Sequence, residues 1–343
     1  MRLAGPAGHA ALAALAGLIA LAPLVATPYE VGFLATTLVA ALFALSLQLL
    51  VGGAGMVSLG HAALFGVGAY MVWFLTPATG AASILLTLPG AALAGAAVAL
   101  AVGALSLRTK GFYFLMTTLA FGQMVYFIFH DTKLGGGADG VFITRPALGL
   151  GDLVWDVPRR QRPAMLLWVN LTVLVLMYAA AAGLMRTLFG RALLGIRANE
   201  HRMGALGLPV YRYKLAAFVL GGAMAGVAGH QWAMTEAFVS PELLGWHRSA
   251  LALLAIVLGG AGWLHGPILG ALAFAVLGEA AGLITERQHL VEGLVILAVV
   301  LALPHGLAGI RLRRRVLPRP AVDTPADPAA GPAGVVTATA TMP

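Results

Sequence analysis

Long apolar segments separated by short polar links dominate this chain of 343 residues. A helix needs about 20 predominantly apolar residues to cross a bilayer, and most of these segments reach that length. The expected spans lie near residues 8–26, 31–51, 55–76, 82–107, 112–130, 164–186, 214–236, 248–264, 266–284 and 289–306. The sequence therefore predicts an all-α, polytopic transmembrane helical bundle of about ten spans.

Composition excludes most other classes of protein. Hydrophobic residues make up 60% of the chain and charged residues only 10%, whereas soluble domains carry about 25% charged residues. A soluble fold of this length cannot bury so much apolar surface, and the continuous apolar runs argue against the alternating pattern of a β-barrel. Because cysteine is absent and the histidines in or next to the spans are not paired at ligand spacing, no metal site is expected.

The Lys and Arg residues indicate how the bundle is oriented. With both termini in the cytoplasm, fourteen of the 21 basic residues lie inside, as the positive-inside rule requires. The main exception is the group Arg159, Arg160 and Arg162 in a long outer segment, 131–163. The net charge of +8 thus reflects membrane orientation, and no nucleic-acid partner is expected.

Three regions follow from this pattern. Residues 1–30 form an N-terminal span and an outer turn, for which we prefer an uncleaved span over a signal peptide. Residues 31–310 form the transmembrane domain. Residues 311–343 begin with a basic cluster and continue as a Pro-, Ala- and Thr-rich tail, which is typical of a disordered cytoplasmic extension.

Residues 52–70 are rich in glycine and contain Ser58 and His61. Glycine costs roughly 1 kcal/mol in a helix interior, so this density favours a broken or re-entrant helix, or very close packing. Two interpretations stay open: packing alone, or a polar substrate pathway formed by Ser58, His61 and Gln123. A Ser58–His61 protease site is disfavoured, because no third orienting group accompanies the pair.

Small residues recur at helical spacing elsewhere in the chain. Gly222 and Gly226, and the series Gly262, Gly266 and Gly270, predict helix-packing seams. Residues 135–140 read GGGADG, and we expect a turn there on the outer side. Residues 259–262 repeat the sequence Gly-Gly-Ala-Gly of residues 52–55, which hints at a parallel internal repeat.

A strongly cationic segment, 187–213, interrupts the apolar pattern. A single helix is expected from Arg191 to Leu206, ended by Pro209. Its apolar side is one thin stripe, formed by Ala192, Ile196, Asn199, Met203 and Leu206. A helix lying on the lipid surface is one interpretation, but the thin stripe and Glu200 favour insertion into a groove of a protein partner.

Several stretches together resemble the LivM-type permease subunits of branched-chain amino acid ABC importers. They are residues 45–70, 118–130, 135–141, 190–214, 221–226, 257–271 and 289–310. The resemblance implies that segment 187–213 couples the chain to a cytoplasmic ATPase. The residues that match the family's coupling pattern are Gly195, Arg197, Glu200, Gly204 and Gly207. The Glu-Ala-Ala sequence common in such motifs is absent here.

The resemblance also implies partners: two cytoplasmic ATPase subunits, a LivH-type partner permease and a periplasmic substrate-binding protein, in the bacterial inner membrane. The chain contains no Walker A sequence, so ATP would be used only by the partners, and this subunit would bind no cofactor. The expected function is import of branched-chain or other hydrophobic amino acids. The alternatives are a related importer for urea or short amides, and a stand-alone secondary transporter.

Overall fold

The computed structural model describes residues 1, 5–76, 83–143, 148–150, 153–155, 158, 161–284, 290, 291, 293, 294, 297, 298 and 306–309. The chain divides into two units, Met1–Ile310 and Arg311–Pro343, and every described residue belongs to the first. The predicted tail, 311–343, and most of the predicted last span, 289–306, lie outside the described residues.

The described residues form a helical bundle, which confirms the predicted all-α class. Its helices are α1 Pro6–Leu21, α2 Pro28–Gln48, α3 His61–Leu75, α4 Ile84–Ser106, α5 Phe112–Asp131, α6 Arg162–Arg186, α7 Leu188–Ala198, α8 Glu200–Ala205, α9 Val210–Glu236, α10 Trp246–Gly259 and α11 Gly266–Ile284. Short helical turns are η1 Ala22–Leu24, η2 Leu49–Ala54, η3 Leu134–Asp139, η4 Pro241–Leu244 and η5 Leu307–Gly309.

Helix length and surface both suit a membrane. Within the described residues, four helical stretches are long and apolar enough to cross a bilayer: Pro28–Ala54, Ile84–Ser106, Phe112–Asp131 and Arg162–Arg186. Shorter apolar helices lie at Gly8–Leu24, His61–Leu75, Trp246–Gly259 and Gly266–Gly282. Large apolar side chains on several of these helices are exposed, among them Leu93, Leu100, Met124, Ile128 and Leu176. Such a surface requires lipid or a partner chain to cover it.

The predicted third span, 55–76, is wrong in its first part. α2 ends in a π-helical turn, η2, and Gly55 then takes a left-handed conformation with φ 72°. The chain stays non-helical until α3 begins at His61. Glycine takes positive φ without steric cost, so the helix breaks here, as the glycine density of residues 52–70 predicts.

Close glycine contacts hold α9 against both α3 and α4. A Cβ atom added to Gly68 would lie 2.3 Å from the carbonyl oxygen of Gly226, and one added to Gly226 would lie 2.2 Å from that of Ala91. The predicted seam at Gly222 and Gly226 is thereby confirmed. In the second predicted seam, Gly266 and Gly270 pack on α10, but a Cβ on Gly262 would meet nothing within 4 Å, so Gly262 does not belong to it.

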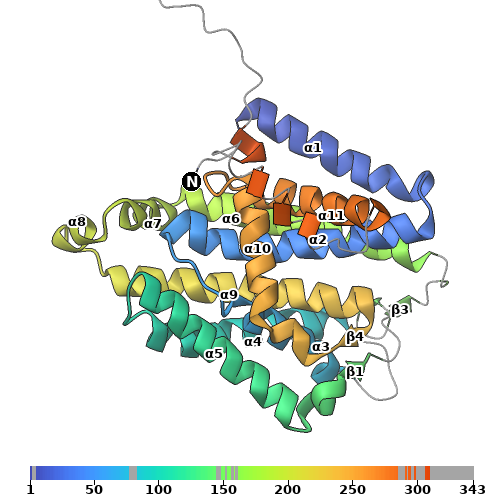
Figure 1. The fold of residues 1–343 in the computed structure, drawn as a ribbon, viewed down its shortest axis with the longest axis horizontal. Helices are drawn as coiled ribbons and strands as arrows, with labels where there is room; N and C mark the ends of the chain where they lie inside the picture. Colours follow the sequence, from blue (N-terminus) through green and yellow to red (C-terminus); the bar gives the residue numbers. More distant parts are fainter. Residues whose placement is uncertain are drawn as a thin grey trace, which may run out of the picture. The chain divides into compact units, whose positions relative to one another are not determined.

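Two short antiparallel pairs supplement the helices. β1 Val141–Phe142 pairs with β4 Phe238–Val239, and β2 Leu148–Leu150 pairs with β3 Leu153–Trp155. The predicted glycine turn precedes β1, and Gly135, Gly136 and Gly137 all have positive φ. In Figure 1, the pair β1–β4 lies at the opposite end of α9 from α7 and α8. The strand pair and the helices α7 and α8 therefore mark two different ends of the bundle.

Candidate functional site

The charged segment 187–213 forms two helices rather than the single predicted helix. Asn199 is extended, with φ −161° and ψ 102°, and it ends α7. Its side-chain oxygen accepts a hydrogen bond of 2.9 Å from the backbone N–H of Arg202, which caps α8. An asparagine at an N-cap accepts a hydrogen bond from one of the free N–H groups at the start of the next helix. Asn199, which was predicted to lie on the apolar stripe of one helix, is therefore the residue that separates α7 from α8.

The buried side of the segment is also shorter than predicted. Ala192, Leu193 and Ile196 on α7 are buried, whereas α8 has no buried residue and Leu206 is 69% exposed. Met203 folds back on α7, where its methyl group would lie 2.8 Å from a Cβ on Gly195. α7 therefore packs on the bundle, and α8 projects from it, as Figure 1 shows.

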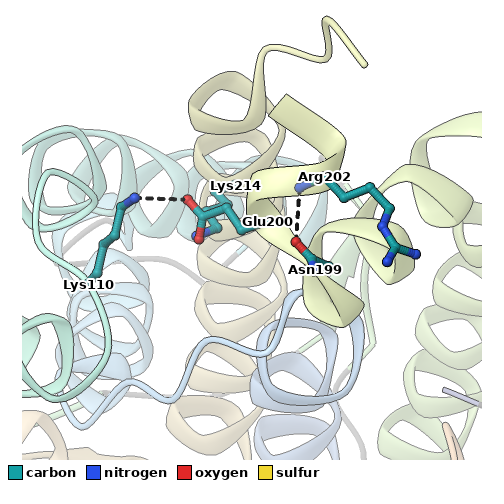
Figure 2. A network of polar contacts seen from close by, with 5 residues as sticks. All are labelled: Lys110, Asn199, Glu200, Arg202 and Lys214. Carbon is teal, nitrogen blue, oxygen red and sulfur yellow. Dashed lines mark hydrogen bonds and ion pairs between the residues drawn. The ribbon is translucent and has the colours of Figure 1, made fainter. Parts of the chain in front are cut away.

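Glu200 joins the segment to two other parts of the chain (Figure 2). Its Oε2 accepts a hydrogen bond of 2.6 Å from Nζ of Lys214 in α9, and its Oε1 lies 3.8 Å from Nζ of Lys110 in the α4–α5 link. Partial burial alone would raise the pKa of Glu200, but the hydrogen bond from Lys214 and the charges of Lys214, Lys110 and His201 together hold the pKa below its ordinary value. Glu200 is thus a stable anion that faces its own chain.

Arg197 connects the segment to the helix break after α2. Its Nη1 donates a hydrogen bond to the carbonyl oxygen of Gly52 in η2. A Cβ on Gly55 would lie only 3.0 Å from Cγ of Arg197, so glycine at 55 also leaves room for this side chain. The other two residues of the coupling pattern, Gly204 and Gly207, have open space where a Cβ would point, and Gly207 has φ 84° before α9 begins.

Gln48 links the helix break after α2 to the helix break after α10. Its Nε2 donates hydrogen bonds of 2.9 Å to the carbonyl oxygens of Ala261 and Trp263. The two Gly-Gly-Ala-Gly stretches therefore lie close to one another. Each ends a helix, α2 in one case and α10 in the other, and each is followed by a second helix.

The three predicted pathway residues occupy two different environments. Ser58 and His61 are fully buried, and Nε2 of His61 lies 2.9 Å from Oγ of Ser46 while its ring stacks on Phe43 at 5.6 Å. Oγ of Ser58 has no hydrogen-bond partner within the described residues, so Ser58 and His61 do not form a nucleophile–base pair.

Gln123 instead lines a polar cavity of about 490 Å³ together with Tyr126, Glu242, Trp246 and Arg248. Arg248 was not singled out by the sequence analysis. The available signal is an arginine in the first turn of an apolar helix, where a charge is costly unless it faces a cavity or a partner.

Comparison with known proteins gives a consistent result. Residues 29–303 match the protein family described as the branched-chain amino acid transport system, permease component. The chain is 32% identical over 289 residues to the high-affinity branched-chain amino acid transport system permease protein LivM of Escherichia coli K12, a match that covers 79% of this chain and 68% of the relative. LivM of Salmonella typhimurium LT2 matches to the same extent.

A more distant relative is the L-arabinose ABC transporter permease protein AraH of Azospirillum brasilense. It is 28% identical over 231 residues, and the match covers 64% of each chain. The matches to the LivM proteins confirm the resemblance inferred from the sequence.

Proposed function

Because this chain belongs to the family of permease components of branched-chain amino acid transport systems, we propose that it is the transmembrane permease subunit of an ATP-driven importer for branched-chain and other hydrophobic amino acids. It is a multi-pass membrane protein, and the bacterial inner membrane is its proposed location. The names of the LivM relatives support this substrate class.

The single observation that carries the proposed mechanism is the way segment 187–213 is tied to the bundle. α8 is exposed and available to a partner, while Glu200 and Arg197 reach back to α9, to the α4–α5 link and to η2. A push on α8 would therefore reach α9 and the α4–α5 link through Glu200, and a push passed on to α7 would reach η2 through Arg197. We infer that nucleotide-driven closure of the ATPases moves this segment and thereby the break between α2 and α3.

Alternating access follows from that arrangement. The bundle would rock between two states that both the ATPases and a docked binding protein bias. The proposed partners are two cytoplasmic ATPase subunits, a LivH-type permease and a periplasmic substrate-binding protein that docks at the end carrying β1 and β4. In this proposal the subunit binds neither ATP nor another cofactor, and hydrolysis belongs to the ATPases.

The test is reconstitution of the complex in proteoliposomes with candidate loaded binding proteins. Uptake of leucine should require ATP, the ATPases and the binding protein, and the leucine-loaded binding protein should stimulate hydrolysis. If ATP hydrolysis is stimulated only by a binding protein loaded with urea, a short amide or a pentose, that compound is the substrate instead. The pentose is included because AraH, a relative of this chain, is named as an L-arabinose permease. Leucine transport by this chain alone would reject the ATP-driven mechanism in favour of a secondary transporter.

A further inference from the structure

An apolar cavity of about 360 Å³ lies between α2, α3, α9, α10 and α11. Its walls are mostly aromatic and small aliphatic side chains, among them Phe33, Phe43, Phe65, Ala252, Ala271 and Phe274. Arg248 is the charged residue in this lining. A mostly apolar cavity of this size with a few fixed polar groups is the usual form of a small-molecule site.

Arg248 forms no ion pair at contact distance in the described part of the chain, although the carboxylates of Glu236 and Glu242 lie close enough to act on its charge. Its guanidinium carbon lies 3.9 Å from the ring centroid of Trp232 and 5.5 Å from that of Phe65. The rings partly compensate the charge, and no hydrogen bond from the guanidinium N–H groups occurs among the described residues. Those groups match the two oxygens of a carboxylate in geometry.

An acidic group lies next to the same cavity: Glu236 does not line it, but it is hydrogen-bonded to a residue that does. Thr36 lines both the apolar cavity and a neighbouring one that Glu236 lines, and its Oγ1 donates a hydrogen bond of 2.8 Å to Oε1 of Glu236. Phe33 is shared by the two cavities as well. Arg248 in the lining and Glu236 behind Thr36 place a cation and an anion near one apolar space, a charge pattern that suits a zwitterion with an aliphatic side chain.

Arg248 also connects this space to the polar cavity that Gln123 and Glu242 line. The polar cavity would admit a hydrated amino acid, and the apolar cavity would receive its side chain after the carboxylate reaches the guanidinium. Gln123 then belongs to the entrance of the path rather than to its centre.

We propose that Arg248 binds the α-carboxylate of the transported amino acid, while the apolar cavity takes its aliphatic side chain and Glu236 faces its ammonium group. This inference rests on the proposed function, because it assumes an amino acid as substrate. Arg248, Trp232 and Glu236 are on this account the residues that recognise the substrate inside the permease.

The experiment measures ATP-driven leucine uptake by the reconstituted full complex. Arg248→Gln should lower uptake at least tenfold at low leucine concentration. Arg248→Lys should recover part of the uptake, because lysine keeps the positive charge but lacks the paired N–H donors of the guanidinium. Binding-protein-stimulated ATP hydrolysis should stay within about twofold of the wild type. Arg186→Gln is the matched control: it removes an exposed positive charge from the last turn of α6 and should transport as the wild type does.

A second variant tests the cavity without touching the charge. Ala275 lines the apolar space, so Ala275→Val should lower the ratio of leucine to valine uptake by at least threefold. If Arg248→Gln fails to fold or to insert into the membrane, this ratio decides alone.

Three outcomes would overturn the site. They are wild-type leucine kinetics in Arg248→Gln, an unchanged substrate ratio in Ala275→Val, and dissociation of the partner permease from Arg248→Gln, which would assign the arginine to the subunit interface. Absence of leucine uptake by the wild-type complex would instead refute the proposed function.

Discussion

Glu200 brings together three parts of the chain that are far apart in sequence: α8, the α4–α5 link and α9. Lys214 is only 16% exposed, so its 2.6 Å hydrogen bond to Glu200 is shielded better than an ordinary surface pair. The folded state lowers the pKa of Glu200. Its stabilising effect is therefore present at pH values above the ordinary carboxyl pKa, and it is lost only as the pH falls through the lowered value. The link is intact at any physiological pH.

Reversing the charge of Glu200 should uncouple the transporter without unfolding it. Glu200→Lys would set three cations against one another, and we expect ATP-driven uptake to fall roughly fivefold or more while hydrolysis continues. Membrane insertion should be unchanged, because a partly exposed pair contributes only about 1 kcal/mol or less to stability. The measurement is uptake per ATP hydrolysed in proteoliposomes.

Two variants separate the internal contact from a general effect of surface charge. The exchange Glu200→Lys with Lys214→Glu restores one opposite-charge pair and should recover part of the coupling. His201→Lys adds a cation at the exposed neighbouring position and should leave coupling near the wild-type level. A swap no better than the single variant, or equal damage from His201→Lys, would contradict the role assigned to Glu200.

At the scale of whole helices, glycine allows α3, α4 and α9 to approach until backbone touches backbone. Such contacts replace the hydrophobic effect as the main source of helix association in a membrane, because lipid solvates apolar side chains equally well. Gly226 lies at the centre of this contact, since it meets Ala91 and Ala92 in α4 and Gly68 in α3.

Gly226→Ala should therefore destabilise the bundle even though alanine is the better helix former. The added methyl group would meet the carbonyl oxygen of Ala91 at 2.2 Å, and overpacking of this kind costs about 1–3 kcal/mol. Gly183→Ala in α6 is the control, because a Cβ there meets nothing within 4 Å, and it should be neutral or stabilising by up to about 1 kcal/mol. Thermal unfolding in detergent compares them, and equal melting temperatures would refute the packing argument.

The sequence predicts these helices well because long apolar runs have few other solutions in a membrane. The break after α2 could be predicted from the density of glycine at residues 52–70. The break at Asn199 could not be predicted. The spacing of Asn199 places it on the apolar stripe of one long helix, whereas its side chain is also suited to cap a new helix, and only the contacts of α7 decide between these two structures. Arg248 was missed for a related reason: the rings and the cavity walls around it come from helices that lie up to about 215 residues away from it along the chain.

For the molecule as a whole, the charged contacts and the strand pairs separate along the bundle. Lys110, Arg197, Glu200 and Lys214 gather where α4 and α7 end and α5 and α9 begin. The turn η3, β1 and β4 follow the other ends of α5 and α9. The separation is the same whichever end faces the cytoplasm, so the placement of the first group and of both termini on the cytoplasmic side stays a prediction.

Labelling of single cysteines can test that orientation directly, because the chain contains no cysteine of its own. His201→Cys in α8 and Asp139→Cys in η3 are at exposed positions, and Thr337→Cys marks the tail. A membrane-impermeant maleimide should label Asp139→Cys in intact cells, and it should reach the other two only after permeabilisation. An even number of spans requires the two ends of the chain to share a side. If Thr337→Cys reacts in intact cells while His201→Cys does not, the region after α9 contains one span fewer or more than predicted, and the positive-inside argument fails for the basic cluster Arg311–Arg315.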